Sequence, residues 1–315
     1  MNGRFEQEEN EAAGYHVPVL FQETLDGLDI KPDGIYVDAT FGGGGHSGGI
    51  LERLGPDGRL IAFDQDPDAE ANLPDDSRVR FVPHNFRHIS RFLRLYKIGP
   101  VDGILADLGV SSHQFDEAGR GFSIRFDGPL DMRMDPRQLK TAADIVAEYP
   151  EAELHKLFER YGEVTNSRTL AKTIVSARKL VKMNSIRQFM EAVRPVVKGN
   201  PNKYFAQVFQ ALRIEVNDEM GVLREFLEQV PALLKPGGRV AIITFHSLED
   251  RIVKQFFKSG STTEETDTNP FEMTAETKNQ LRLVNKKPIT AGPEERKRNT
   301  RSRSAKLRVA EKKEA

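Results

Sequence analysis

The sequence contains no cysteine and no tryptophan. Without cysteine, the chain can form neither a disulfide nor a thiolate metal site, and it has no thiolate nucleophile. The absence also fits a reducing cytoplasm, which is the location that we expect for this protein.

Long apolar runs are missing as well. No stretch approaches the ~20 apolar residues that are needed to span a bilayer, so we expect a soluble protein without a membrane partner. The first residues carry Glu6, Glu8, Glu9 and Glu11 but no apolar core, which is unlike a signal peptide. We interpret residues 1–14 as a flexible acidic tail.

The chain has almost no net charge, at −1, but its charged residues are unevenly distributed along the sequence. The C-terminal region is basic and is interrupted by few acids. Such a block commonly contacts phosphates, and its short polar residues favour nucleic acid over a merely solvated tail. The basic residues are Lys286, Lys287, Arg296, Lys297, Arg298, Arg301, Arg303, Lys306 and Arg308.

The first third of the chain alternates short apolar runs with helical patterns. Helical spacing of apolar residues follows the first run at 48–54 and the third at 86–96. This alternation is typical of a parallel sheet with crossover helices, so we expect an α/β fold. The predicted strands are 35–37, 60–63, 79–82 and 101–106.

The alternation stops between Pro129 and Arg213, where only helical patterns are found. Four amphipathic stripes predict helices near 154–161, 170–177, 186–193 and 205–212. We therefore expect an all-helical insertion at 129–213, which interrupts a discontinuous domain made of 15–128 and 214–315.

The α/β pattern resumes after the insertion. A long helix from Asn217 to Lys235, kinked at Pro231, precedes a buried strand at 239–244. A helix at 248–258 and a polar loop from Ser259 to Pro270 follow. Alternating residues at 281–284 and 306–309 predict a closing pair of strands.

A glycine-rich run from Asp38 to Gly48 follows the first predicted strand. Glycines at this place let a backbone approach a nucleotide-type cofactor, and Asp64, which ends the second strand, would accept hydrogen bonds from a ribose. Gly43, Gly45 and Gly48 also satisfy the NAD fingerprint, but a second nucleotide-binding half is missing from the pattern.

Acids at the ends of three strands favour S-adenosylmethionine over NAD. Asp38 is expected to face the methionine ammonium group and Asp64 the ribose hydroxyls. Phe86 is expected to pack on the adenine. Asp107 ends the fourth strand, at the edge where ligands bind in open α/β sheets. The residues indicate a methyltransferase rather than a dehydrogenase.

Asp107 begins the segment Asp-Leu-Gly-Val-Ser-Ser, at the place where enzymes that methylate exocyclic amines of bases carry Asp-Pro-Pro-Tyr. A carboxylate that accepts an N–H bond would make such an amine more nucleophilic, and transfer then needs mainly alignment. Asp107 is therefore the candidate catalytic residue, and the alternative is that it only binds cofactor or caps a loop. Phe115 or Phe122 would stack the base, unless both belong to the core.

The histidines show no metal-ligand spacing, so we expect no metal site. His46, inside the glycine run, is predicted to lie in the cofactor pocket. His246, at the end of the fifth predicted strand, either faces the substrate or has a structural role.

Several long motifs resemble the family of ribosomal RNA small subunit methyltransferase H. The resemblance covers nearly the whole chain after Gly14. The motifs include His16-Val-Pro-Val-Leu20, Val37-Asp-Ala-Thr-Phe-Gly-Gly-Gly-Gly-His-Ser47, Asp107-Leu-Gly-Val-Ser-Ser112, Gly128-Pro-Leu-Asp-Met-Arg-Met-Asp135, Thr244-Phe-His-Ser-Leu-Glu-Asp-Arg251 and Arg301-Ser-Arg-Ser-Ala-Lys-Leu-Arg308.

The resemblance implies methyl transfer from S-adenosylmethionine to N4 of a cytidine in the decoding region of 16S rRNA. It also implies a Rossmann-like class I methyltransferase sheet with a helical insertion, which we expect to recognise the substrate. Asp107 belongs to the implied cofactor set, which weakens its catalytic assignment without excluding it. The implied cofactor residues are Gly44, Gly45, His46, Asp64, Phe86, Asp107 and Gln114.

Two alternatives stay open. The first is a methyltransferase that acts on a small molecule or a protein, for which the basic region would be incidental. The second is a non-catalytic ribosome-assembly factor, against which the intact glycine run and Asp64 argue. The expected partner is the small ribosomal subunit, and the sequence neither requires nor excludes a homodimer.

Overall fold

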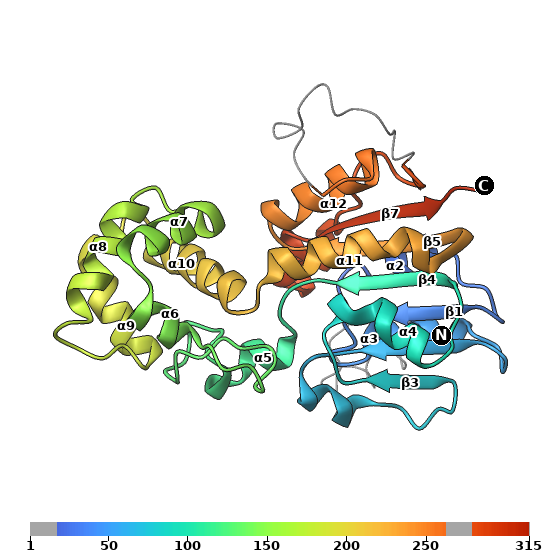
Figure 1. Ribbon diagram of the computed structural model, residues 1–315, viewed down its shortest axis with the longest axis horizontal. Coiled ribbons are helices and arrows are strands. Elements are labelled where there is room, and N and C mark those ends of the chain that lie inside the picture. The colour runs from blue at the N-terminus through green and yellow to red at the C-terminus, as the bar shows by residue number, and fades with distance from the viewer. Residues whose placement is uncertain (1–17, 263–278, 315) are drawn as a thin grey trace. The chain divides into compact units, whose positions relative to one another are not determined.

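The structure is a computed structural model that describes residues 18–262 and 279–314. The expected acidic tail, and most of the expected loop from Ser259 to Pro270, lie outside these residues. The chain forms two compact units, which are coloured along the sequence in Figure 1. The first comprises Met1–Asp64, Asp68–Leu108 and Leu227–Ala315, and the second comprises Gln65–Pro67 and Gly109–Phe226.

The first unit is built on a seven-stranded sheet with the order β3-β2-β1-β4-β5-β7-β6. Strands β1 to β5 are parallel, and β7 runs antiparallel to both of its neighbours. This is the order of a class I methyltransferase sheet, so the predicted fold and the predicted closing pair of strands are confirmed. The strands are β1 (Ile35–Asp38), β2 (Arg59–Phe63), β3 (Val79–Val82), β4 (Val101–Asp107), β5 (Leu234–Thr244), β6 (Leu281–Leu283) and β7 (Lys306–Lys312).

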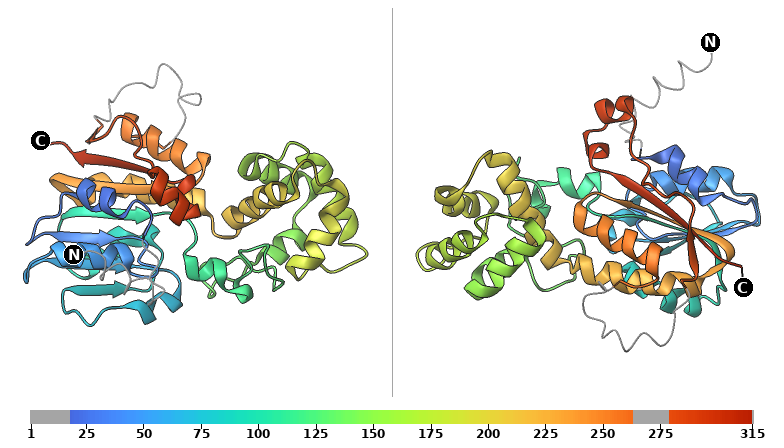
Figure 2. Two further views of the ribbon diagram at one scale, coloured as in Figure 1. Left: turned by 180° about the vertical axis from the view of Figure 1, so that it is seen from behind. Right: turned by 90° about the horizontal axis from the view of Figure 1, so that it is seen from above.

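Helices cover both faces of this sheet, which explains why its central strands are continuous apolar runs rather than alternating ones. Viewed from above in Figure 2, α2 and α3 lie on one face and α12 on the other. Leu25 of α2 and Ile50 of α3 pack with Leu105 and Leu307 of the sheet. The helices are α2 (Phe21–Leu28), α3 (Gly45–Arg53), α4 (Ile89–Leu95), α12 (Ser247–Ser259) and α13 (Pro293–Arg298), with 3-10 turns at η1 (Pro67–Asn72), η2 (Phe86–His88) and η6 (Thr300–Arg303).

Every named element of the second unit is a helix, and among its described residues an irregular segment at 121–141 separates η3 from α6. The four predicted helices correspond to α7–α10, and a further helix, α6, begins at a capping box between Thr141 and Asp144. The helix α11 (Glu219–Leu233) contains Pro231, begins in this unit and ends in the first one. The others are α5 (Ser112–Asp116), α6 (Ala142–Glu148), α7 (Glu151–Gly162), α8 (Ser167–Ala177), α9 (Ile186–Val193) and α10 (Pro201–Val216), with 3-10 turns at η3 (Ala118–Arg120) and η4 (Arg194–Val196).

The second unit contains the expected insertion, 129–213, but reaches from Gly109 to Phe226. The extension has a physical reason, because Phe122 is buried in the helical core with Phe158 and Phe189, and Phe115 packs against that core. None of the helices in the described parts of the chain has both the length and the apolar character of a bilayer-crossing helix.

Candidate cofactor site

The glycine loop leaves the sheet at Asp38, the last residue of β1. Asp38 is 1% exposed, and burial raises the pKa of its carboxyl group. One carboxylate oxygen accepts from Thr40 N (3.0 Å) and the other from Ser47 Oγ (2.7 Å). Asp38 thus binds residues at both ends of the loop, Thr40 and Ser47, through a buried side chain. The expectation that it faces the methionine ammonium group is wrong, since this side chain offers a ligand almost no surface.

Asp64 lies beside the same loop. It follows β2, and its Oδ2 accepts a hydrogen bond from Gly42 N at 2.7 Å. Asn72 Nδ2 donates to Gly42 O at 3.0 Å from the other side. The loop is therefore tied to the acid that was predicted to bind the ribose, and that role stays a prediction.

Three consecutive glycines of the loop meet three different requirements. Gly44 has a φ of 76° and forms the N-cap of α3, which is a left-handed conformation that favours glycine. A Cβ on Gly45 would lie 2.4 Å from Pro18 Cγ, whereas a Cβ on Gly43 would meet no atom within 4 Å. Of these three glycines, only Gly43 has backbone that faces open space. It lies next to the N-terminus of a helix, where amides favour anionic groups.

Alanine substitutions should separate these roles. We expect Gly43→Ala to keep its stability within about 0.5 kcal/mol, because its methyl group meets no protein atom, and to weaken cofactor binding. Gly45→Ala should lose about 1–3 kcal/mol, because the new methyl group overlaps Pro18. Thermal unfolding and titration calorimetry of the two variants check this, and equal losses of stability would contradict the assignment.

His46 occupies the first turn of α3. Its ring is 6% exposed, stacks on Phe21 and has Nε2 at 3.2 Å from Val19 O. Burial lowers the pKa of the imidazole to about 4, although the contact with Val19 opposes the shift. The ring is therefore neutral at neutral pH. Its other nitrogen, Nδ1, lies 3.6 Å from Asp107 Oδ2.

Asp107 ends β4 and is held through its backbone, since its N–H donates to Thr40 Oγ1 at 2.7 Å. Its Oδ1 is buried and makes no hydrogen bond with the described residues. Burial raises the pKa of this carboxyl group to about 7; Arg301 opposes the rise, and Asp38 and Glu249 add to it. A buried acceptor without a donor costs about 1–3 kcal/mol, so the site fits a ligand that brings a donor or a positive charge.

Phe86 begins the short turn η2 that follows β3. The turn is fixed by Asn85, whose side chain accepts from Arg87 N at 2.9 Å. The aromatic ring thus comes from the loop after the third parallel strand, where an adenine-binding residue was predicted. The contact with adenine stays a prediction.

Gln114 belongs to the second unit, apart from the other six predicted cofactor residues. Its Nε2 donates to Asp66 Oδ2 at 2.7 Å, and its Oε1 accepts from Ser111 N at 3.1 Å. Arg120 Nη1 donates to the same Asp66 oxygen at 2.7 Å. Neither Asp66 nor Arg120 was among the residues predicted from the sequence. The available signals were a second acid close behind Asp64 and the arginine that begins the segment Arg120-Gly-Phe-Ser123.

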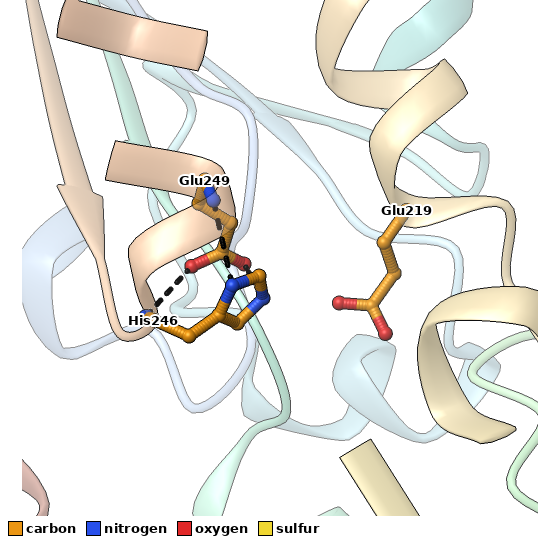
Figure 3. A group of neighbouring side chains, drawn as sticks. All are labelled: Glu219, His246 and Glu249. Atoms are coloured by element: carbon orange, nitrogen blue, oxygen red, sulfur yellow. Dashed lines mark hydrogen bonds and ion pairs between the residues drawn. The ribbon is translucent and has the colours of Figure 1, made fainter. Parts of the chain in front are cut away.

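His246 has a structural role in the N-cap of α12 (Figure 3). Its Nδ1 accepts from Glu249 N at 3.4 Å, and Glu249 Oε2 accepts from Phe245 N at 2.9 Å. His246 Nε2 lies 3.2 Å from Glu249 Oε1. This capping box occupies Nδ1 and supports the structural role. Nε2 is buried and makes no hydrogen bond with the described residues, so a role toward the substrate stays a prediction.

The basic C-terminal region is not a tail. Arg308 lies within β7, is 4% exposed and donates through Nε to Asp250 at 2.7 Å. Lys306 Nζ binds the other oxygen of Asp250 at 3.0 Å. The prediction of a phosphate contact is wrong for Arg308, because its guanidinium is buried against Asp250. For Lys306, whose side chain is 41% exposed, the contact stays a prediction. Six others are exposed, namely Lys286, Lys287, Arg296, Lys297, Arg298 and Arg303.

Comparisons with known proteins agree with this architecture. The model of the MraW methylase family matches residues 13–313. The chain is 55% identical over 300 residues to a ribosomal RNA small subunit methyltransferase H of Parabacteroides distasonis, covering 95% of this chain and 97% of that protein. It is 53% identical over 306 residues to the protein of that name from Bacteroides thetaiotaomicron, covering 97% and 100%.

Proposed function

We propose that this chain, which belongs to the MraW methylase family, transfers a methyl group from S-adenosylmethionine to N4 of a cytidine in small-subunit ribosomal RNA. The names of the relatives support the RNA class of the substrate. The assignment of the target as N4 of a cytidine in the decoding region rests on the resemblance of the motifs. The structural observation that carries the proposal is the buried Asp107 Oδ1, which makes no hydrogen bond with the described residues, at the end of the strand that Thr40 links to the glycine loop.

The protein's part in this reaction is chiefly positioning. S-adenosylmethionine supplies an electrophilic methyl group when bound. Asp64 and the loop amides would hold the cofactor, and Asp107, fixed by Thr40, would accept an N–H of the attacking amine. When the carboxylate accepts this hydrogen bond, the amine is drawn out of conjugation with the ring. Its lone pair then becomes localised on the nitrogen. The proton that leaves N4 would pass to the carboxylate or to water.

Transfer of labelled methyl groups tests the proposal. Small subunits that lack the modification are incubated with the protein and labelled S-adenosylmethionine, and the RNA is digested to nucleosides. We expect the label in N4-methylcytidine. Label in another nucleoside would show that the target is a different base or atom. Absence of label in RNA would favour a small-molecule or protein substrate. If calorimetry showed no cofactor binding, a non-catalytic assembly factor would be supported instead.

The second unit offers a surface that suits RNA. The residues that follow α8 expose Leu180 (87%) and Val181 (51%) between Lys179 and Lys182. Neither lysine has a carboxylate partner among the residues that the structure describes. Two unpaired cations around an aliphatic tip can bind phosphates while the tip packs on sugars or bases. We therefore include this loop in the substrate-binding surface.

Salt dependence should reveal the role of the loop. The double variant Lys179→Gln/Lys182→Gln should flatten the plot of log affinity against log salt by about 1–2 units, since each lost phosphate contact removes ~0.7–0.9. The matched control changes Lys254 and Lys258, two exposed lysines of α12, and should keep the slope of the wild type. A double variant with the wild-type slope would remove the loop from the RNA surface.

A further inference from the structure

The pairing of His46 with Val19 fixes where the imidazole carries its proton. Nε2 faces the carbonyl oxygen of Val19 at 3.2 Å, and a carbonyl oxygen can only accept. Nε2 must therefore be protonated. Since the buried ring is neutral at neutral pH, it carries no second proton, and Nδ1 presents a lone pair.

That lone pair lies next to Asp107. The distance from Nδ1 to Asp107 Oδ2 is 3.6 Å. If Asp107 were ionised, the lone pairs of Oδ2 and Nδ1 would face and repel each other. A protonated carboxyl group can instead donate a hydrogen bond toward Nδ1. The second oxygen, Oδ1, is buried and receives no donor from the described residues. Both observations favour the acid form of Asp107 in the protein alone.

The charged groups around this pair are consistent with that conclusion. Desolvation is the largest influence on Asp107 and raises its pKa. Asp38 and Glu249 act in the same direction because they are like charges, and Arg301 acts against them. The net result lies near neutrality, where a single added positive charge decides the protonation state.

We propose that His46 is a positioning residue that keeps Asp107 as a hydrogen-bond donor, and that binding of the cationic cofactor releases the Asp107 proton to solvent. The proposal rests on the proposed function for its cofactor. In this step the O–H bond of the carboxyl group breaks, its electron pair stays on the oxygen, and the buffer takes up the proton. The carboxylate that results is the form that can accept an N–H from an amine, so cofactor binding would prepare Asp107 for the substrate.

Carbon NMR of the protein alone tests the pair without any cofactor. The Asp107 carboxyl resonance should titrate near pH 7. His46→Phe keeps a ring beside Phe21 but removes the acceptor, so the midpoint should fall by about one pH unit. His46→Asn can offer an amide donor to the carboxylate and should also lower it. His155→Phe, the same change on α7 in the second unit, is the control. A wild-type midpoint near 4, or one that His46→Phe leaves unchanged, would overturn the proposal.

Calorimetry in buffers of different ionisation heat tests the release of the proton. At pH 7 the wild type should release about half a proton per S-adenosylmethionine bound, and His46→Phe clearly less. Binding without proton release would overturn the proposal and leave the proposed cofactor intact. If S-adenosylmethionine did not bind at all, the proposed function would fail and the coupling with it, while the NMR titration would still decide the state of Asp107.

Discussion

Asp107→Ala should lower the rate of methyl transfer by about 10²–10⁴, the range in which a positioned acid or base acts. Asp107 joins the end of β4 to the glycine loop through Thr40, and its buried Oδ1 is the acceptor that no described residue uses. Without the carboxylate, the amine keeps its delocalised lone pair and the methyl donor loses a counter-charge.

Two measurements on this variant separate the roles of the carboxylate. Single-turnover rates report the chemical step, and calorimetry with S-adenosylmethionine reports cofactor affinity. Retained affinity with slow transfer would assign Asp107 to the amine, while lost affinity would assign it to the cofactor. Asp107→Asn, which keeps the shape but not the charge, is the matched variant. A rate within tenfold of the wild type would contradict both roles.

Asp250→Ala should cost about 3 kcal/mol of unfolding free energy, because it leaves Arg308 as a buried charge without its partner. The Asp250 side chain is 12% exposed and that of Arg308 is 5% exposed. The control is Asp26→Ala, which removes an ion pair with Arg53 at a position that is 61% exposed. Such an exposed pair contributes about 0–1 kcal/mol. Denaturant unfolding of both variants checks the contrast, and equal losses would contradict it.

The same pair gives stability a defined pH dependence. Burial alone would raise the pKa of Asp250, but the hydrogen bonds from Arg308 and Lys306 outweigh it, and the net pKa is lowered. A lowered pKa in the folded state stabilises the protein above the pKa of the unfolded state, about 3.9. The contribution is lost as the pH falls through the folded pKa. The stability difference between wild type and Asp250→Ala should therefore shrink in acid.

The sheet was predictable because its signal is local. Each parallel strand is a short apolar run that ends at a polar residue, and helices on both faces remove the need for alternation. The helix α6 was missed because its seven residues are too few to show a helical period. The signal that remained was the capping box from Thr141 to Asp144, which a search for apolar stripes does not detect.

The sequence predicts where the site residues lie in the fold, but not which groups they bind. The sequence indicates that Asp38 and Asp107 end strands at one edge of the sheet, and it cannot show that Ser47 and Thr40 enclose the first acid while the second keeps an unpaired oxygen. The basic residues show the same limit. Arg308 looks like a phosphate ligand until Asp250, 58 positions earlier, is found beside it.

The position of β7 has a consequence for synthesis on the ribosome. β7 pairs with β5 on one side and β6 on the other, so the strand made after both of them lies inside the sheet rather than at its edge. The edge of β5 must therefore stay unoccupied while α12 and β6 are synthesised. During that interval the edge of β5 carries unpaired backbone groups, which other strands could join. Residues 109–226 emerge earlier, so the helical unit can fold before the sheet that it interrupts is closed.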